Sequence, residues 1–189
     1  ADVDVDFEYT VADHPTTTES IANLMSTLDG ELKYGKRKRQ HNTVKALADY
    51  QFGPDAGDAL FADVDLQTTS RYPKLQVRDG DGEGDDGGPG EQLATMVPQY
   101  GTLSFTLAGA RRWLASDAPT KRVEIDAFVP HGSVLAPGVV DADDEIRVGD
   151  EVVIEGPKAF AVGRAEMAGP EMVDSTRGVA SEVRHVDER

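Results

Sequence analysis

Apolar and polar residues alternate along the first two thirds of the chain, with a period that changes from segment to segment. In residues 3–9 apolar side chains alternate with acidic ones, which predicts a half-buried strand. Helical spacing of apolar residues predicts helices at 16–30, 44–52, 54–61 and 106–115. Shorter apolar runs predict strands at 64–66, 72–77, 93–97 and 103–105. We therefore expect a small α+β domain over residues 1–118.

The last third of the chain has a different spacing of apolar residues. Four apolar runs are separated by clusters of Gly, Pro and Asp: 134–140, 152–154, 160–162 and 179–183. This spacing is typical of a small closed β unit. Pro137-Gly138 requires a sharp turn, and residues 169–173 form the one short stretch with helical character. We expect a β-barrel over residues 119–189, with the domain boundary at Ala118-Pro119-Thr120.

Acidic residues dominate the charge of the chain. The sequence holds 35 Asp and Glu against 19 Lys and Arg, a net charge of −16, with 12 Arg against 7 Lys. This composition resembles that of proteins from salt-accumulating archaea, in which carboxylates keep the surface hydrated and salt screens their repulsion. The net charge is therefore no argument against nucleic-acid binding. Since no apolar run is long enough to span a membrane and no signal segment is present, we expect a cytoplasmic protein.

One stretch departs from this acidic background. Residues 31–45 carry six Lys or Arg against Glu31 alone, and the densest part is Lys36-Arg37-Lys38-Arg39. With no apolar residue among residues 36–41, the stretch is a loop or a solvated helix start. It is either an ordinary solvated face or a surface that contacts phosphates, and its isolation in an acidic chain favours the phosphate interpretation.

Residues 79–90 form an acidic, Gly-rich run whose Asp79, Asp81, Glu83 and Asp85 imitate the start of a calcium-binding loop. Gly90 occupies the position where a closing Glu is required, so we predict a hairpin tip and no metal site. The sequence has no Cys, its four His are isolated from one another, and no nucleotide-binding or nucleophile motif occurs. We expect no catalytic residue and no cofactor.

The C-terminal pattern, VLAPGVVDADDEIRVGDEVVI followed by AVGRAEM and RGVASEV, resembles the PUA domain, an RNA-binding β-barrel of pseudouridine synthases and archaeosine-forming enzymes. The run ALADYQFGPDAGDALF (residues 46–61) is similar to the domain that precedes the PUA module in archaeal tRNA-guanine transglycosylases and archaeosine synthase. In those transglycosylases the nucleophilic carboxylate and a cysteine-rich zinc site lie in an upstream barrel. The resemblance covers the accessory C-terminal part, so the transglycosylase activity does not carry over.

The resemblance implies non-catalytic binding of structured RNA, with tRNA favoured, by a stand-alone PUA protein linked to tRNA modification. Two alternatives stay open, namely an accessory subunit of an archaeosine-type tRNA-modifying enzyme and a ribosome-associated translation factor. Gly163 either satisfies a turn or lets the backbone approach RNA. The RNA-contacting residues that we expect are the basic stretch (Lys36, Arg37, Lys38 and Arg39), the segment around the first barrel strand (Gly132, Ser133, Leu135 and Gly138) and two phosphate contacts (Arg164 and Arg177).

Overall fold

The computed structural model describes residues 38–61, 64–71, 74–80 and 90–189. The chain divides into two compact units, residues 1–43 and residues 44–189. In the first unit the described residues 38–43 are helical. The predicted strand at 3–9, the predicted helix at 16–30, the side chains of Lys36 and Arg37, and most of the acidic run (81–89) lie outside the described residues.

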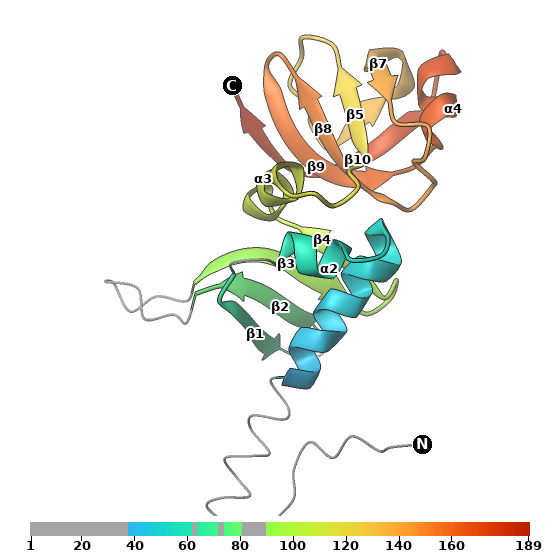
Figure 1. The fold of residues 1–189 in the computed structure, drawn as a ribbon. Helices are drawn as coiled ribbons and strands as arrows, with labels where there is room; N and C mark the ends of the chain where they lie inside the picture. Colours follow the sequence, from blue (N-terminus) through green and yellow to red (C-terminus); the bar gives the residue numbers. More distant parts are fainter. Residues whose placement is uncertain (1–37, 62–63, 72–73, 81–89) are drawn as a thin grey trace, which may run out of the picture. The chain divides into compact units, whose positions relative to one another are not determined.

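The second unit begins with a helical segment over residues 44–52 and a short helix, α2 (Ala56–Leu60). A four-stranded antiparallel sheet follows in the order β1-β2-β3-β4 (Figure 1). Its strands are β1 (Leu66–Arg71), β2 (Lys74–Asp79), β3 (Glu91–Val97) and β4 (Thr102–Phe105). Helix α3 (Leu107–Ala115) completes this part, with the Thr106 hydroxyl accepting the N–H of Gly109 at its N-terminus. The mixed helix and sheet content confirms the predicted α+β class.

The remaining residues form a curled six-stranded sheet, a half-barrel, in the order β6-β10-β9-β8-β5-β7 (Figure 1). Its elements are β5 (Arg122–Ile125), β6 (Ser133–Leu135), the 3-10 helix η1 (Ala136–Gly138), β7 (Val139–Ala142), β8 (Glu151–Gly156), β9 (Ala159–Ala165), helix α4 (Gly169–Asp174) and β10 (Val179–Glu188). Strands β5 and β8 are parallel, and the other neighbouring strands of this sheet are antiparallel. The edge strands β6 and β7 are joined directly by η1, so the curl brings the two edges of the sheet together.

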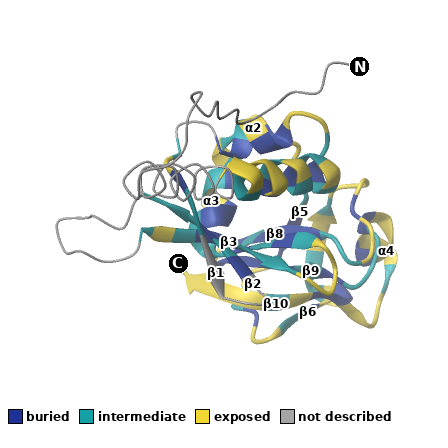
Figure 2. Ribbon diagram, turned by 90° about the horizontal axis from the view of Figure 1, so that it is seen from below, coloured by how far each residue is buried: buried dark blue, intermediate teal, exposed yellow. Residues whose placement is uncertain are grey.

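Strands β8 and β9 are buried on both of their faces, and Figure 2 shows the buried residues of β8 in dark blue. Side chains of one parity, among them Val152 and Ile154, fill the interior of the half-barrel. Side chains of the other parity, Val153, Phe160 and Val162, belong to a second core cluster. Because successive residues of a strand point to opposite faces, one pair of strands serves two cores.

The second cluster also contains the helical segment and the four-stranded sheet. At its centre the Trp113 ring centroid lies 4.5 Å from that of Phe52 and 5.5 Å from that of Phe105. Trp113 is fully buried. The four-stranded sheet and the outer face of β8 and β9 therefore share one apolar core.

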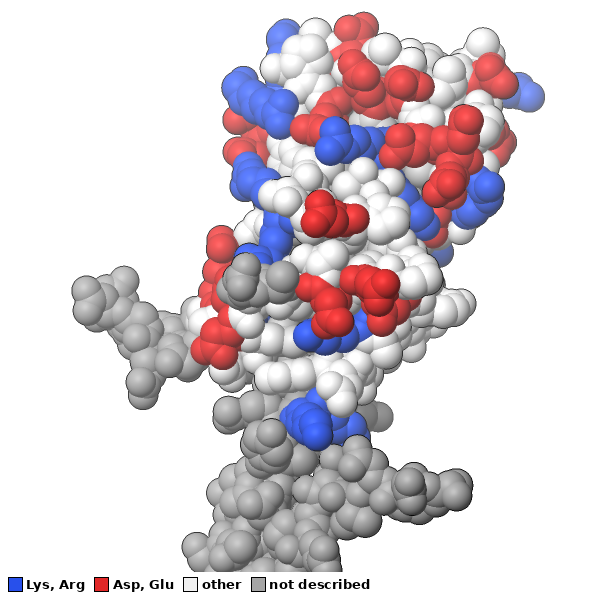
Figure 3. Space-filling model, viewed as in Figure 1, with Lys and Arg blue, Asp and Glu red and all other residues white. Residues whose placement is uncertain are grey.

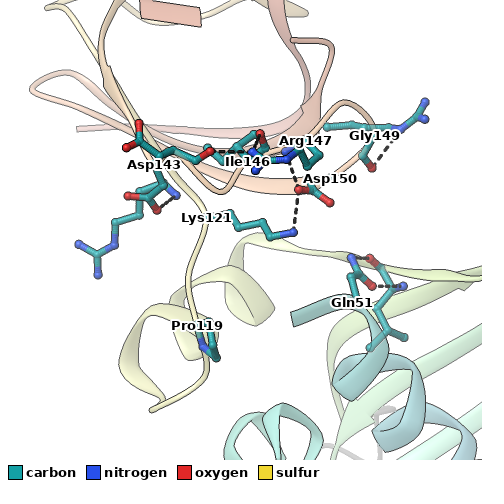
Figure 4. A network of polar contacts seen from close by, with 12 residues as sticks. Gln51, Pro119, Lys121, Asp143, Ile146, Arg147, Gly149 and Asp150 are labelled. Atoms are coloured by element: carbon teal, nitrogen blue, oxygen red, sulfur yellow. Dashed lines mark hydrogen bonds and ion pairs between the residues drawn. The ribbon is translucent and has the colours of Figure 1, made fainter. Parts of the chain in front are cut away.

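The segment between α3 and β5, which joins the four-stranded sheet and its helices to the half-barrel, is held by specific contacts. The Trp113 Nε1–H donates to the Pro119 carbonyl (3.0 Å), and the Lys121 ammonium pairs with Asp150 Oδ2 (2.7 Å). Asp150 also accepts the Arg147 N–H, as Figure 4 shows. These contacts tie the segment to α3 on one side and to the loop before β8 on the other. The domain boundary at residues 118 and 119 stays a prediction.

Candidate nucleic-acid interface

The segment from Gly132 to Gly138 forms one edge of the half-barrel. Strand β6 pairs with the start of β10, where Leu135 lies opposite Val179. Two backbone hydrogen bonds extend this pairing, from the Ala136 N–H to the Gly178 carbonyl (3.0 Å) and from the Val183 N–H to the Gly132 carbonyl (2.9 Å). The exposed Arg177 immediately precedes this pairing. The structure thus places Arg177 next to the segment that carries four other predicted site residues, Gly132, Ser133, Leu135 and Gly138.

Apolar side chains are exposed along this edge. Leu135 keeps 54% of its surface exposed, and the opposing Val179 keeps 37%. Helix α4 contacts η1 and β7 and carries Val173, which is also exposed. Isolated exposed apolar residues are ordinary on protein surfaces, but two that face each other across a strand pair form a small apolar surface. We call Leu135, Val179, Val173 and the neighbouring Arg177 the β6 edge.

Two glycines of the segment have different roles in the fold. Gly132 has a φ of +79°, a conformation that residues with a side chain rarely adopt, and a Cβ there would meet open space. A Cβ at Gly138 would lie 2.9 Å from two carbons of the Phe128 ring. Gly138 is therefore needed for packing against Phe128, whatever else it contacts.

Arg164 does not belong to the β6 edge. It lies on β9, and its guanidinium carbon is 4.4 Å from the centroid of the Tyr100 ring in the turn between β3 and β4. Its Nε also lies 3.4 Å from the Gly149 carbonyl. Arg164 joins the half-barrel to the four-stranded sheet, and about a third of its side chain (34%) stays exposed. A cation stacked on an aromatic ring stabilises such a contact.

The described part of the basic stretch lies on the helical segment of the first unit. Lys38 and Arg39 are both exposed there. The phosphate contacts expected of this stretch stay a prediction. On the face of the molecule in Figure 3, basic and acidic side chains are interspersed.

A buried carboxylate that the sequence does not single out lies between the half-barrel and the four-stranded sheet. Glu151, at the start of β8, is 5% exposed, accepts the Phe105 N–H (2.8 Å) and forms an ion pair with Arg184. Burial raises the pKa of Glu151 from 4.5 to about 7, although the charge of Arg184 and both hydrogen bonds lower it. Among 35 acidic residues, nothing in the sequence marks this one as buried.

Gly163 explains how Arg184 reaches that carboxylate. In the pairing of β10 with β9, Val183 lies opposite Gly163 and His185 opposite Val162, so Arg184 is the extra residue of a β-bulge. A Cβ at Gly163 would lie 2.0 Å from the Glu182 carbonyl oxygen. Gly163 lies within a strand, so the turn interpretation is wrong, and its absent side chain makes room for the bulged strand.

The described residues contain no cluster of three or more His, Asp or Glu side chains that could hold a metal ion. In the same part of the chain no helix is both long and apolar enough to cross a membrane. The first position of the acidic run, Asp79, ends β2, and the last, Gly90, directly precedes β3, which pairs antiparallel with β2.

Two protein families match the chain in succession. Residues 42–119 match the patch-forming domain C2 of tRNA-guanine transglycosylase, and residues 121–186 match the PUA domain. The chain thus carries a C2 domain followed by a PUA domain, as the two sequence resemblances predict.

The relatives locate this pair of domains within longer proteins. The chain is 70% identical to archaeosine synthase of Haloferax volcanii over 188 residues, which are all of this chain and 31% of that protein, its C-terminal part. It is 42% identical to archaeosine synthase subunit alpha of Methanosarcina acetivorans, over 96% of this chain and 29% of the relative. The chain spans about a third of the length of these relatives. The first of them is haloarchaeal, in agreement with the composition.

A solved structure supports the fold. A conserved PUA domain protein from Thermoplasma acidophilum superposes with a TM-score of 0.54 at 21% identity, covering 78% of this chain and 88% of that protein. At this level of identity the similarity concerns the fold alone.

Proposed function

We propose that this chain binds structured RNA, with tRNA as the preferred ligand, and that it performs no catalytic step itself. The observation that supports this most directly is the β6 edge of a domain that matches the PUA family. Leu135, Val179 and Arg177 present apolar surface and one cation side by side, on a backbone fixed by the pairing of β6 with β10.

High salt makes the apolar part of this edge important. Binding by phosphate contacts draws its free energy from released counterions, and that contribution falls steeply as salt rises. A protein with this acidic composition is suited to concentrated salt, where Lys and Arg contacts contribute little. Affinity in such a solvent has to come from shape, stacking and apolar contact, which the exposed Leu135 and Val179 can provide.

The link to tRNA modification rests on the relatives. Two of them are named archaeosine synthase and archaeosine synthase subunit alpha, and the chain corresponds to about a third of each. This proportion favours a second proposal, that the chain serves as the RNA-binding part of an archaeosine-type enzyme, in the same polypeptide or as a subunit. A ribosome-associated role stays a third candidate, which sedimentation of the chain with ribosomal subunits would support.

The test is a binding measurement in molar potassium chloride. A fluorescently labelled tRNA transcript is expected to bind the full chain more tightly than an unstructured RNA of equal length, because the β6 edge is rigid and recognises shape. Equal affinity for both RNAs, or no binding of either, would contradict the proposal. Co-purification with a tRNA-modifying enzyme from haloarchaeal cells then separates the accessory role from an independent one.

A further inference from the structure

A cavity of about 590 Å³ lies between the two domains, on a side that the β6 edge does not include. Its walls come from β3, the turn after it and β4 in the C2 domain, and from β10 in the PUA domain. The volume falls in the range of about 300–1,000 Å³ that is usual for small-ligand sites. Because both domains supply its walls, the cavity exists only when they are joined.

The lining of the cavity differs from the rest of the surface. In a chain with 35 Asp and Glu, no acidic side chain is among the residues that line it. Gln99, Ser104 and His185 present an amide, a hydroxyl and an imidazole, and none of the three makes a side-chain hydrogen bond to another described residue. The side chains of Val97 and Pro98 form an apolar part of the cavity wall. The cavity therefore offers neutral donors and acceptors beside an apolar surface.

Arg184 is the charged group of the cavity, and it is held in place from behind. The β-bulge directs its guanidinium toward Glu151, which binds one Nη. Glu151 is in turn held by the Phe105 N–H. A guanidinium carries five N–H donors, so others remain available to a ligand. Above pH 7, where Glu151 is ionised, its buried carboxylate compensates much of the positive charge, which makes the site poor for a phosphate and suitable for neutral acceptors.

We propose that this cavity binds one unpaired nucleobase of the RNA. Gln99, Ser104, Arg184 and His185 form hydrogen bonds with the edge of the base, and Val97 and Pro98 contact its face. This inference rests on the proposed function, because the base is part of the bound RNA. Protein recognition of single-stranded positions in RNA uses this combination of edge hydrogen bonds and face contacts. A phosphate would instead meet the buried carboxylate behind Arg184.

The first test uses the full chain and small probes. Guanosine, adenosine, cytidine, uridine and ribose 5-phosphate are titrated separately, and the backbone amide signals of Gln99 and Ser104 are followed by NMR. At least one nucleoside is expected to shift both signals, with ribose 5-phosphate having no effect. Shifts by ribose 5-phosphate alone, or by none of the five probes, would overturn the assignment of a base site.

The second test uses the labelled tRNA transcript. The double variant Gln99→Ala/His185→Ala removes two exposed polar groups and is expected to weaken binding about tenfold with an unchanged salt dependence, since neither group releases counterions. Val186→Ala, on the next residue of β10 and outside the cavity lining, is the matched control. The pair Glu151→Gln/Arg184→Gln removes the guanidinium without leaving a buried charge alone, and it is expected to weaken binding as well.

The outcomes separate the inference from the proposed function. If the wild-type chain binds tRNA and both cavity variants bind equally well, the cavity holds no base and the proposed function stands. If the wild-type chain binds no RNA, both are overturned. A loss of affinity accompanied by a shallower salt dependence would show a phosphate contact in place of a base and would also overturn the inference.

Discussion

Replacing Glu151 by Gln is expected to remove a pH dependence of folding that originates at the interface of the two domains. The pKa of Glu151 rises from 4.5 to about 7 on folding, mainly through burial. The folded state therefore binds a proton more tightly than the unfolded state, and stability must fall as the pH rises between these two values. The contribution is fully present below pH 4.5 and lost above pH 7.

The size of the effect follows from the same two values. A difference between 4.5 and about 7 corresponds to about 3 kcal/mol of folding free energy. Gln can still accept the Phe105 N–H but does not ionise, so the variant should match the wild type near pH 4 and exceed its stability by up to about 3 kcal/mol at pH 8. Arg184, with 30% of its side chain exposed, can be hydrated once its partner is neutral.

The assay is urea denaturation at constant molar potassium chloride, followed by the fluorescence of Trp113, the single Trp of the chain and fully buried. Glu182→Gln, which neutralises an exposed acid on β10, is the control for the general loss of one negative charge. If Glu151→Gln is less stable than the wild type at pH 8, the ion pair with Arg184 outweighs the cost of burial. The argument from burial would then be refuted.

Four further predictions concern the candidate RNA-contacting residues, the stability of the fold and the effect of salt. Replacing residues 36–39 by Gln should leave folding intact and make the salt dependence of tRNA binding shallower by up to about four counterions, whereas an unchanged slope would mark the stretch as a solvated face. Leu135→Ala should weaken tRNA binding several-fold in molar salt without lowering the melting temperature, while Val148→Ala, an equally exposed apolar residue outside the β6 edge, should have no effect. Gly138→Val should displace Phe128 and cost about 1–3 kcal/mol of stability in the same urea assay. The melting temperature should rise with potassium chloride, and a flat profile would contradict the interpretation of the acidic composition.

Elements with a strong apolar period were predictable, and those that expose their polar residues were not. Helix α3 and strands β3, β4 and β8 lie where their apolar spacing places them. Strand β1 begins where its predicted run ends, because most of its residues are polar and it lies at the edge of the sheet. The prediction missed β5, which has two apolar residues, and it ended β10 at Val183, beyond which the strand is mostly polar and exposed.

The sequence also predicts some residues of the candidate site and misses others. The PUA resemblance implies Leu135, Arg164 and Arg177 as contacts, but it does not tell that only Leu135 and Arg177 lie at the β6 edge. The buried Glu151 could not be predicted, because a strand buried on both faces gives one continuous apolar signal and does not tell which face meets another domain. The only sequence feature that indicates the bulge at Arg184 is the glycine at position 163 of the neighbouring strand.

The core that β8 and β9 share with the C2 domain constrains how the C2 and PUA domains can evolve. Phe160 and Val162 of one domain are packed with Phe52 and Phe105 of the other, so a change of size on either side alters what its counterpart contacts. Substitutions at these positions are then constrained jointly, and exchanging either domain for a distant homologue would leave a mismatched surface. We therefore expect the two domains to be inherited together, with recombination falling outside the pair.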